Sequence, residues 1–236
     1  MKLGGRWLRS RRRRPATLER MPAEYRERLS MSLADWLVYH HDEIVFKRVT
    51  WMGVRTLKNP LDCWIYQEIL HEVRPDVVVE IGSLAGGSTL FLAHMLDAIG
   101  GGSVLSIDVD RSSFVAVHPR IHCLTGDSAD PSIVAQAEAF CGRRRVLVIH
   151  DGDHTREHVV QDLEAYARLV SVGSYLIVED SIVDLFESGQ GPGTSWAGPL
   201  PAIDEFLRRN PGFEIDRERE RYLLTYNPHG FLRRAR

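Results

Sequence analysis

Short apolar runs separated by helix-length segments place the strongest constraint on how this 236-residue chain can fold. The runs are DVVVEIG (76–82), SVLSIDVD (103–110), RIHCLTGD (120–127), RVLVIHDGD (145–153) and SYLIVED (174–180). Strands that are buried on both faces and alternate with helices form a doubly wound parallel sheet. The pattern therefore predicts an α/β fold in which the strand order reverses between the first and the fourth of these runs.

The end of the chain departs from this alternation. Two β-prone runs, FEID (213–216) and RYLLTYN (221–227), are separated by only a few charged residues, so we expect an antiparallel hairpin. A mostly parallel sheet that ends in such a hairpin is similar to the seven-stranded, Rossmann-like methyltransferase sheet. Amphipathic segments ahead of the first run predict an N-terminal helical extension.

Composition divides the chain into three parts. Residues 1–20 carry eight basic residues against one acidic residue, which predicts a basic, disordered arm. Residues 21–70 form the helical segment, and residues 71–230 form the α/β domain. The Gly- and Pro-rich stretch 184–200 follows the fifth run and is suited to a lid over a ligand.

Charge and hydropathy limit the classes of protein that need to be considered. No apolar stretch reaches the roughly 18 to 20 residues that span a bilayer, and the N-terminus has no secretory h-region. We therefore expect a cytoplasmic protein. The three cysteines, Cys63, Cys123 and Cys141, are widely spaced, which favours buried thiols over disulfides or a thiolate metal site. The basic arm alone would suggest RNA binding, and a solvated tail is the simpler interpretation.

The loop after the first predicted strand is a candidate cofactor site. Its glycines are spaced G-x-x-x-G-G, and the second glycine of the dinucleotide fingerprint is missing. S-adenosylmethionine has no phosphates, so its loop needs only a tight turn and close backbone approach. The predicted cofactor residues of this loop are Glu80, Gly82, Ser83, Gly86, Gly87 and Ser88.

Two further strand ends support this cofactor. Asp108 ends the second predicted strand, 26 residues beyond Gly82, where a carboxylate can accept both ribose hydroxyls. Asp127 and Ser128 follow the third strand, in the region where methyltransferases commonly contact the adenine. Each residue also has a simpler explanation as part of a turn or a helix cap. Their order along the chain favours S-adenosylmethionine.

Acidic residues end the fourth and fifth predicted strands. Asp151, Glu179 and Asp180 are expected to converge, because the carboxyl ends of neighbouring parallel strands meet at one edge of the sheet. Unpaired, they would repel one another, and a hard divalent cation would offset that cost. Oxygen ligands favour Mg²⁺, with Mn²⁺ or Ca²⁺ as alternatives. Asp153 is better placed to cap the next helix than to bind metal.

Several motifs resemble a known family. They are VVEIGSLAGGSTLFLA, IHDGDH, LIVEDS, the W-x-G of Trp51 and Gly53, and the K-x-P-x-D of Lys58, Pro60 and Asp62. Over roughly residues 48–230 the chain resembles the so-called cephalosporin hydroxylase family, which contains S-adenosylmethionine-dependent methyltransferases, including rhamnosyl O-methyltransferases. The 28-residue spacing from Asp151 to Glu179 is also similar to that of metal-dependent macrolide sugar O-methyltransferases.

The resemblance implies roles for the acidic strand ends and for His154. Asp151, Glu179 and Asp180 would bind the metal, and His154 would act with Asp151 in catalysis as the general base that takes the proton of a sugar hydroxyl. His154 also has a simpler interpretation as a surface residue at the start of a helix. His150, inside the strand, is expected to be packed.

The acceptor is less constrained than the chemistry. We expect a small glycosylated molecule, a natural product or a glycolipid, that is methylated on a sugar hydroxyl. Methylation of an amino-sugar nitrogen is the nearest alternative. Methylation of RNA is a weaker hypothesis, because only the basic arm supports it. A short-chain dehydrogenase is disfavoured because no Tyr-x-x-x-Lys occurs. Members of the family that this chain resembles commonly form multimers, so the resemblance implies that the chain could form a homo-oligomer.

Overall fold

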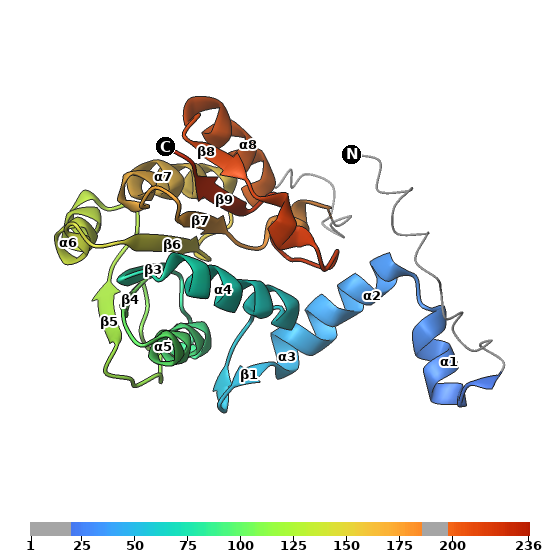
Figure 1. The fold of residues 1–236 in the computed structure, drawn as a ribbon. Helices are drawn as coiled ribbons and strands as arrows, with labels where there is room; N and C mark the ends of the chain where they lie inside the picture. Colours follow the sequence, from blue (N-terminus) through green and yellow to red (C-terminus); the bar gives the residue numbers. More distant parts are fainter. Residues whose placement is uncertain (1–19, 186–197) are drawn as a thin grey trace. The chain divides into compact units, whose positions relative to one another are not determined.

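The computed structural model describes residues 20–185 and 198–236, and the chain divides into two compact units, residues 1–40 and 41–236. In the first unit the described residues form two helices, α1 (Ala23–Ser30) and α2 (Leu33–Tyr39) (Figure 1). Ser32 caps α2, and its hydroxyl accepts a hydrogen bond from the backbone N–H of Asp35 at 3.1 Å. The predicted basic arm lies almost wholly outside the described residues.

A seven-stranded sheet forms the centre of the second unit. The strand order is β5-β4-β3-β6-β7-β9-β8, with β3 to β7 parallel and β9 antiparallel to both β7 and β8. The strands are β3 (Val77–Ile81), β4 (Ser103–Asp108), β5 (Ile121–Thr125), β6 (Val146–His150), β7 (Tyr175–Val178), β8 (Phe213–Ile215) and β9 (Phe231–Arg234). The order reverses between β3 and β6, as the sequence predicted. The Rossmann-like fold class is therefore confirmed.

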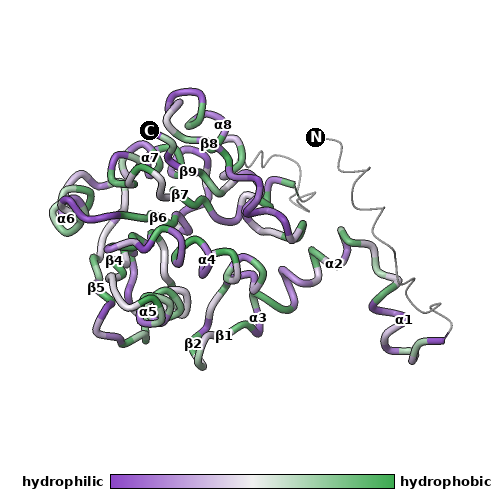
Figure 2. Tube along the Cα trace, in the orientation of Figure 1, coloured by the Kyte–Doolittle hydropathy of each residue, from purple (hydrophilic) through white to green (hydrophobic). Residues whose placement is uncertain are grey.

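Helices cover both faces of this sheet (Figure 1). They are α4 (Pro60–Val73), α5 (Gly87–Ile99), α6 (Pro131–Cys141), α7 (Arg156–Tyr166) and α8 (Pro199–Arg209). Apolar side chains of α4 and α5 form one core with the sheet, and those of α6, α7 and α8 form a second core on the other face. The strands β6 and β7 are correspondingly hydrophobic (Figure 2). Burial on both faces explains why these strands read as continuous apolar runs.

Shorter elements lead into the sheet. A π-helical turn, η2 (His40–Val45), and α3 (Phe46–Arg48) precede a two-stranded antiparallel pair, β1 (Thr50–Trp51) with β2 (Val54–Arg55). Short 3₁₀ segments are η3 (Ala167–Leu169), η4 (Ser181–Leu185) and η5 (Arg217–Glu220). No helix among the described residues is long and apolar enough to cross a bilayer.

The C-terminal hairpin exists, but one of its strands was assigned wrongly from the sequence. β8 lies within FEID, whereas the partner strand is β9 and not the run 221–227. The reason is a buried carboxylate: Asp62 accepts hydrogen bonds from Thr225 Oγ1 at 2.7 Å and from the Tyr226 backbone N–H at 2.8 Å. Polar groups of that run therefore bind a side chain of α4 instead of a neighbouring strand.

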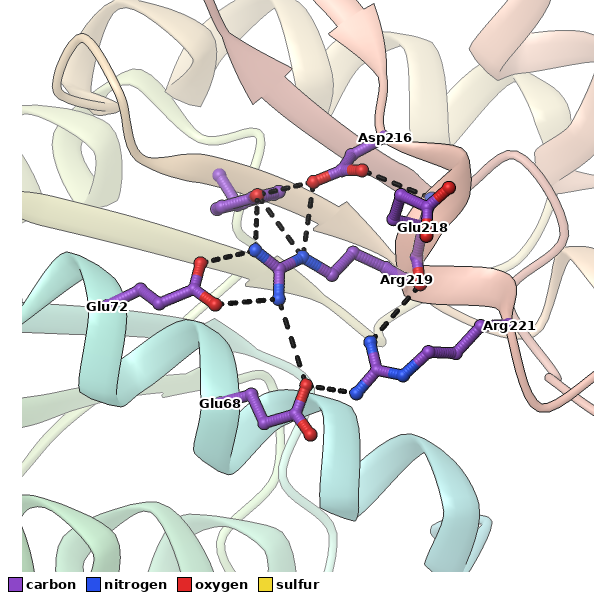
Figure 3. A network of polar contacts seen from close by, with 7 residues as sticks. Glu68, Glu72, Asp216, Glu218, Arg219 and Arg221 are labelled. Carbon is purple, nitrogen blue, oxygen red and sulfur yellow. Dashed lines mark hydrogen bonds and ion pairs between the residues drawn. The ribbon is translucent and has the colours of Figure 1, made fainter.

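An arginine network fastens the segment before this run to α4 and β7 (Figure 3). Arg219 pairs with Glu72, and its Nε donates to Asp216 Oδ2 at 3.1 Å. Arg221 pairs with Glu68, and the hydroxyl of Tyr175 donates to Asp216 at 2.6 Å. These contacts join two ends of the second unit that are about 150 residues apart in sequence.

The burial of the tryptophan and cysteine side chains differs from one residue to the next. Trp64 in α4 is 59% exposed. The cysteines are free, as expected, but only Cys141 is buried, while Cys63 is half-buried and Cys123 is exposed. Trp64 points outward because the core of this face is filled by Ile65, Ile69 and Leu70 together with α5.

Candidate active site

The carboxyl ends of β6 and β7 bring the predicted acidic residues together. The two strands are parallel neighbours, with His150 paired to Val178, and the Glu179 backbone N–H donates to the His150 carbonyl at 2.9 Å. Asp151 and Glu179 therefore begin their loops side by side. Asp180 follows with a φ of +56°, a left-handed conformation that is costly for a residue other than glycine. Such strain at a strand end is typical of functional sites.

His154 joins this cluster from the loop ahead of α7. Its Nε2 lies 3.5 Å from Asp151 Oδ1 and 3.8 Å from Asp180 Oδ2. One ligating atom from each of Asp151, His154 and Asp180 lies within 4.8 Å of the others. Asp153 does not join them, and its carboxylate accepts a hydrogen bond from the Thr155 N–H at 2.7 Å, at the start of α7. The N-cap residue of α7 is Thr155, so Asp153 holds the turn ahead of the helix and does not cap it, contrary to the expectation.

Lys58 is the site residue that sequence reasoning missed. It lies in the loop before α4, is only 5% exposed, and its Nζ donates to Asp151 Oδ2 and to Glu179 Oε2, the latter at 2.6 Å. In the sequence it stood out only as part of the K-x-P-x-D motif. Another signal was available: lysines are rare here, and Lys58 is the one that directly precedes an Asn-Pro helix start. An ammonium thus lies between two of the three carboxylates.

Burial and charge divide the acidic groups into two kinds. Burial alone would raise the pKa of Asp151, but Lys58 and His154 lower it to about 2. Burial raises the pKa of Glu179 to about 8 in spite of Lys58, and burial together with the negative charge of Asp151 raises the pKa of Asp180. Asp151 is therefore the firmly ionised member of the cluster.

The two basic groups are both charged near neutrality. Burial would lower the pKa of His154, but Asp151 and Asp180 raise it to about 9. Burial would likewise lower the pKa of Lys58, but Asp151, Glu179 and Glu80 raise it well above its usual value. With a pKa of about 9, His154 is an imidazolium at neutral pH, a form that cannot accept a proton.

A cavity of about 700 Å³ opens onto this cluster. Predicted site residues that line it are Gly82, Ser83, Ser88, Asp108, Asp127, Ser128, Asp151, His154 and Asp180, and Lys58 and His158 line it as well. The cavity lies at the carboxyl ends of β3 and β6, where the strand order reverses. This is the place at which open α/β sheets bind their ligands.

Gly82 makes the turn from β3 into the cavity. Its φ is +82°, and a Cβ at this position would lie 1.9 Å from the backbone oxygen of Asp151. The Asp151 N–H donates to the Ile81 carbonyl at 2.7 Å, so the two strand ends are in direct backbone contact. Only glycine allows this approach. The cofactor loop and the carboxylate cluster are consequently parts of one site.

Asp108 fixes the conformation of the same loop. Its Oδ2 accepts hydrogen bonds from Ser83 N at 2.8 Å, Ser83 Oγ at 3.1 Å and Leu84 N at 3.0 Å. These donors and the Asp110 N–H outweigh burial and lower the pKa of Asp108. Arg111 supports the arrangement by donating to Ser83 Oγ at 2.7 Å. An ionised carboxylate therefore stands at the cavity wall, at the position predicted for the ribose contact.

The remaining loop residues lie further back. Glu80 is fully buried, receives a hydrogen bond from Thr89 Oγ1, and is not among the cavity-lining residues of the described chain. Gly86 and Gly87 begin α5, and a Cβ at Gly87 would lie 1.9 Å from Thr56 Oγ1. Gly87 thus serves close packing against the chain around β2, whereas a Cβ at Gly86 would lie 2.7 Å from Phe114 and Ala116.

A polar cluster borders the end of the cavity predicted to hold adenine. Asp162 Oδ2 accepts from Ser128 Oγ at 3.0 Å and lies 3.0 Å from His150 Nε2 and 3.2 Å from His158 Nδ1. The other ring nitrogen of His158 is 3.3 Å from Asp127. His150 is fully buried, as expected, and its contact with Asp162 helps to fix α7 against the sheet.

Trp51 lies outside this cavity. Its ring packs edge-on against Phe91, and its indole N–H donates to His94 Nδ1 at 2.9 Å. It lines a separate, mostly apolar cavity of about 350 Å³ between β1 and α4. Most of the predicted lid 184–200 lies outside the described residues.

The donor set suits a hard divalent cation. Carboxylate oxygens of Asp151 and Asp180 lie together with an imidazole, Glu179 is adjacent, and no thiol is present among these groups. Oxygen-rich sets of this kind bind Mg²⁺, Mn²⁺ or Ca²⁺ in preference to soft metals. Lys58 is the one element that does not fit a ligand set, because an ammonium competes with a cation for the same oxygens.

Fold and site together define a Rossmann-like methyltransferase. Residues 43–235 match the model of the family described as Rhamnosyl O-methyltransferase/CmcI. The rhamnosyl O-methyltransferase of Mycobacterium leprae is 34% identical over 201 residues, covering 82% of this chain and 86% of that protein. Its counterpart in Mycobacterium tuberculosis H37Rv is 32% identical over 207 residues, covering 82% and 81%.

Solved structures agree on the fold. A CmcI structure described with Mg and SAM superposes with a TM-score of 0.62 at 22% identity, covering 94% of this chain and 87% of that one. A CmcI structure without ligand gives the same TM-score at 23% identity, covering 94% and 90%. The chain thus belongs to the Rhamnosyl O-methyltransferase/CmcI family, and it is a methyltransferase.

Proposed function

We propose that this protein transfers a methyl group from S-adenosylmethionine to a sugar hydroxyl, with the help of a divalent metal ion. The observation that carries the proposal is the meeting of two sites in one cavity. The Gly82 turn of the cofactor loop touches Asp151 backbone to backbone, and the side chain of Asp151 lies beside His154 and Asp180. The cofactor loop, the candidate base and two of the carboxylates therefore line one cavity of about 700 Å³, which would hold the reacting groups close together.

The cofactor would lie across the ends of β3, β4 and β5. Asp108, ionised at the cavity wall, is placed to accept the ribose hydroxyls, and Ser83 and Ser88 line the neighbouring loop. Asp127 and Ser128 line the cavity at the adenine end. When bound, S-adenosylmethionine supplies the methyl group as a sulfonium, so the chain has only to align the acceptor and remove its proton.

The metal would be held by Asp151, Glu179 and Asp180, with Mg²⁺ the favoured ion and Mn²⁺ or Ca²⁺ the alternatives. A divalent cation bound there supplies a Lewis acid, which orients vicinal hydroxyls of a sugar and lowers the pKa of one of them. Asp151 is already ionised, whereas burial raises the pKa of Glu179 and favours its protonated form. Positive charge at these carboxylates would favour their ionised forms.

His154 would take the proton of the sugar hydroxyl at Nε2. In the metal-free structure Asp151 and Asp180 hold this imidazole in its charged form. A base has to be neutral before it accepts a proton, so part of the negative charge around His154 must first be compensated. Dependence on the metal follows from this requirement as well as from activation of the hydroxyl.

The substrate class rests on the relatives, which are named rhamnosyl O-methyltransferases. These names favour a hydroxyl over an amino-sugar nitrogen. We therefore propose a glycosylated natural product or glycolipid, with a deoxyhexose such as rhamnose as the methylated sugar.

Activity assays on purified protein test this proposal. Methylation of simple rhamnosides is followed by mass spectrometry with S-adenosylmethionine, with Mg²⁺ or with EDTA. We expect turnover with Mg²⁺ and a loss of at least about 100-fold with EDTA or in Asp151→Asn. Asp153→Asn, which changes the neighbouring carboxylate at the helix start, serves as the control and should retain activity. Equal turnover in EDTA would refute the metal requirement, and failure to bind S-adenosylhomocysteine would refute the cofactor.

A further inference from the structure

Lys58 holds a position that a metal ion would need. Its ammonium is buried and donates to Asp151 Oδ2 and Glu179 Oε2 at the same time. Those two residues are also two of the three carboxylates proposed to bind the metal. An ammonium and a divalent cation cannot both be close to the same carboxylate oxygens, because their like charges repel.

The metal-free site needs a cation of its own. Of the three carboxylates, Glu179 is buried and Asp151 and Asp180 are half-buried, and buried charges without partners are strongly destabilising. His154 approaches Asp151 and Asp180, which leaves Glu179 to Lys58. Glu179 is only 3% exposed, so water cannot take the place of the ammonium. Lys58 is therefore the group that compensates the innermost carboxylate.

We propose that Lys58 is a resident counter-ion, which occupies the cation position of the metal-free protein and is exchanged for the divalent ion on loading. The inference rests on the metal site of the proposed function and adds a residue that competes with the metal. Lys58 thereby preserves the fold of the empty site at the expense of metal affinity. It is a positioning residue and not a ligand.

The exchange needs only the side chain of Lys58 to move. The backbone after it is anchored, because Asn59 caps α4 through a hydrogen bond from Leu61 N and donates from Nδ2 to the Leu224 carbonyl at 2.7 Å. Pro60 fixes the first position of the helix. The charge of Glu80, which is fully buried on β3, also acts on Lys58.

The test compares Lys58→Met with Lys47→Met. Both variants remove an ammonium and keep an unbranched side chain, but Lys47 is exposed and pairs with Glu43, four residues earlier, away from the carboxylate cluster. Mg²⁺ binding is measured by calorimetry with S-adenosylhomocysteine saturating, and thermal unfolding is measured in EDTA and in Mg²⁺. Lys58→Gln, which keeps a polar end, repeats the measurements if the Met variant does not fold.

We expect Lys58→Met to bind Mg²⁺ at least about 10-fold more tightly than wild type, since no ammonium has to be displaced. In EDTA its Tm should fall by about 5 °C or more, and Mg²⁺ should close most of that gap. Lys47→Met should match wild type in both measurements. Mg²⁺ affinity that is unchanged or weaker in Lys58→Met, with wild type still binding the ion, would overturn this inference alone. If neither protein binds Mg²⁺ while both bind S-adenosylhomocysteine, the metal site of the proposed function fails, and this inference fails with it.

Discussion

The charge on His154 makes a quantitative prediction about stability. Asp151 and Asp180 raise the pKa of His154 to about 9, from about 6.5 in an unfolded chain. A raised histidine pKa contributes stability that is fully present below pH 6.5 and is lost as the pH rises through 9. Since one pKa unit corresponds to about 1.4 kcal/mol, the contribution is at most about 3 kcal/mol. The His154 side chain is 23% exposed, so solvent screening reduces this contribution only in part.

Denaturant unfolding of the metal-free protein between pH 6 and pH 9.5 measures this contribution. The quantity is the difference in free energy of unfolding between wild type and His154→Gln at each pH. We expect it to shrink by about 2 to 3 kcal/mol as the pH rises from 6.5 to 9. Burial raises the pKa of Glu179 to about 8, so the stability that Glu179 contributes also falls with rising pH, over a lower and overlapping pH range. Wild type and variant are therefore compared at equal pH.

His71→Gln is the matched control, because His71 is exposed on α4, and its difference from wild type should not change over this range. Parallel curves for wild type and His154→Gln would refute the placement of a charged His154 among the carboxylates. Saturating Mg²⁺ should flatten the dependence in wild type, since a cation at Asp151 and Asp180 reduces the attraction that keeps His154 protonated.

Two substitutions test the cofactor side of the cavity. Gly82→Ala should destabilise the protein by more than about 3 kcal/mol in denaturant unfolding, because its Cβ would overlap the Asp151 backbone oxygen. Gly100→Ala, at a similar φ but with open space, should cost only about 1 kcal/mol, and equal losses would contradict the contact. Asp108→Asn should weaken S-adenosylhomocysteine binding by about 10-fold or more in calorimetry, because the ionised acceptor for the ribose and the Ser83 N–H is lost. Unchanged affinity would remove Asp108 from the cofactor site.

The acidic half of the site was predictable because it depends on local rules. Each carboxylate ends a strand, and neighbouring parallel strands bring their ends to one edge, so the pattern of runs was enough to place Asp151 near Glu179. Lys58 follows no such rule. It is 93 residues from Asp151 and 121 from Glu179, in a loop whose position depends on how α4 packs on the sheet. Packing of that kind leaves no periodic signal in one sequence.

The strand prediction for residues 221–227 was wrong for a related reason. Its residues have high β-propensity, which expresses a fit to a half-buried pleated surface and not a fixed backbone preference. In the folded chain Asp62, more than 160 residues away, offers Thr225 and Tyr226 a carboxylate instead. The strand prediction for FEID held because Phe213 and Ile215 of β8 pack against the core that contains Phe206 of α8.

The balance of charge connects the two halves of the proposed mechanism. In the metal-free site Asp151, Glu179 and Asp180 face Lys58 and His154, so three acidic groups meet two basic ones. Exchange of the ammonium for a divalent ion would add one positive charge at the same place, and the added repulsion would lower the pKa of His154 and favour its neutral form. The event that loads the site therefore also produces the neutral base that the reaction requires. A site with Lys58 still between Asp151 and Glu179 would bind the cofactor but keep its base protonated.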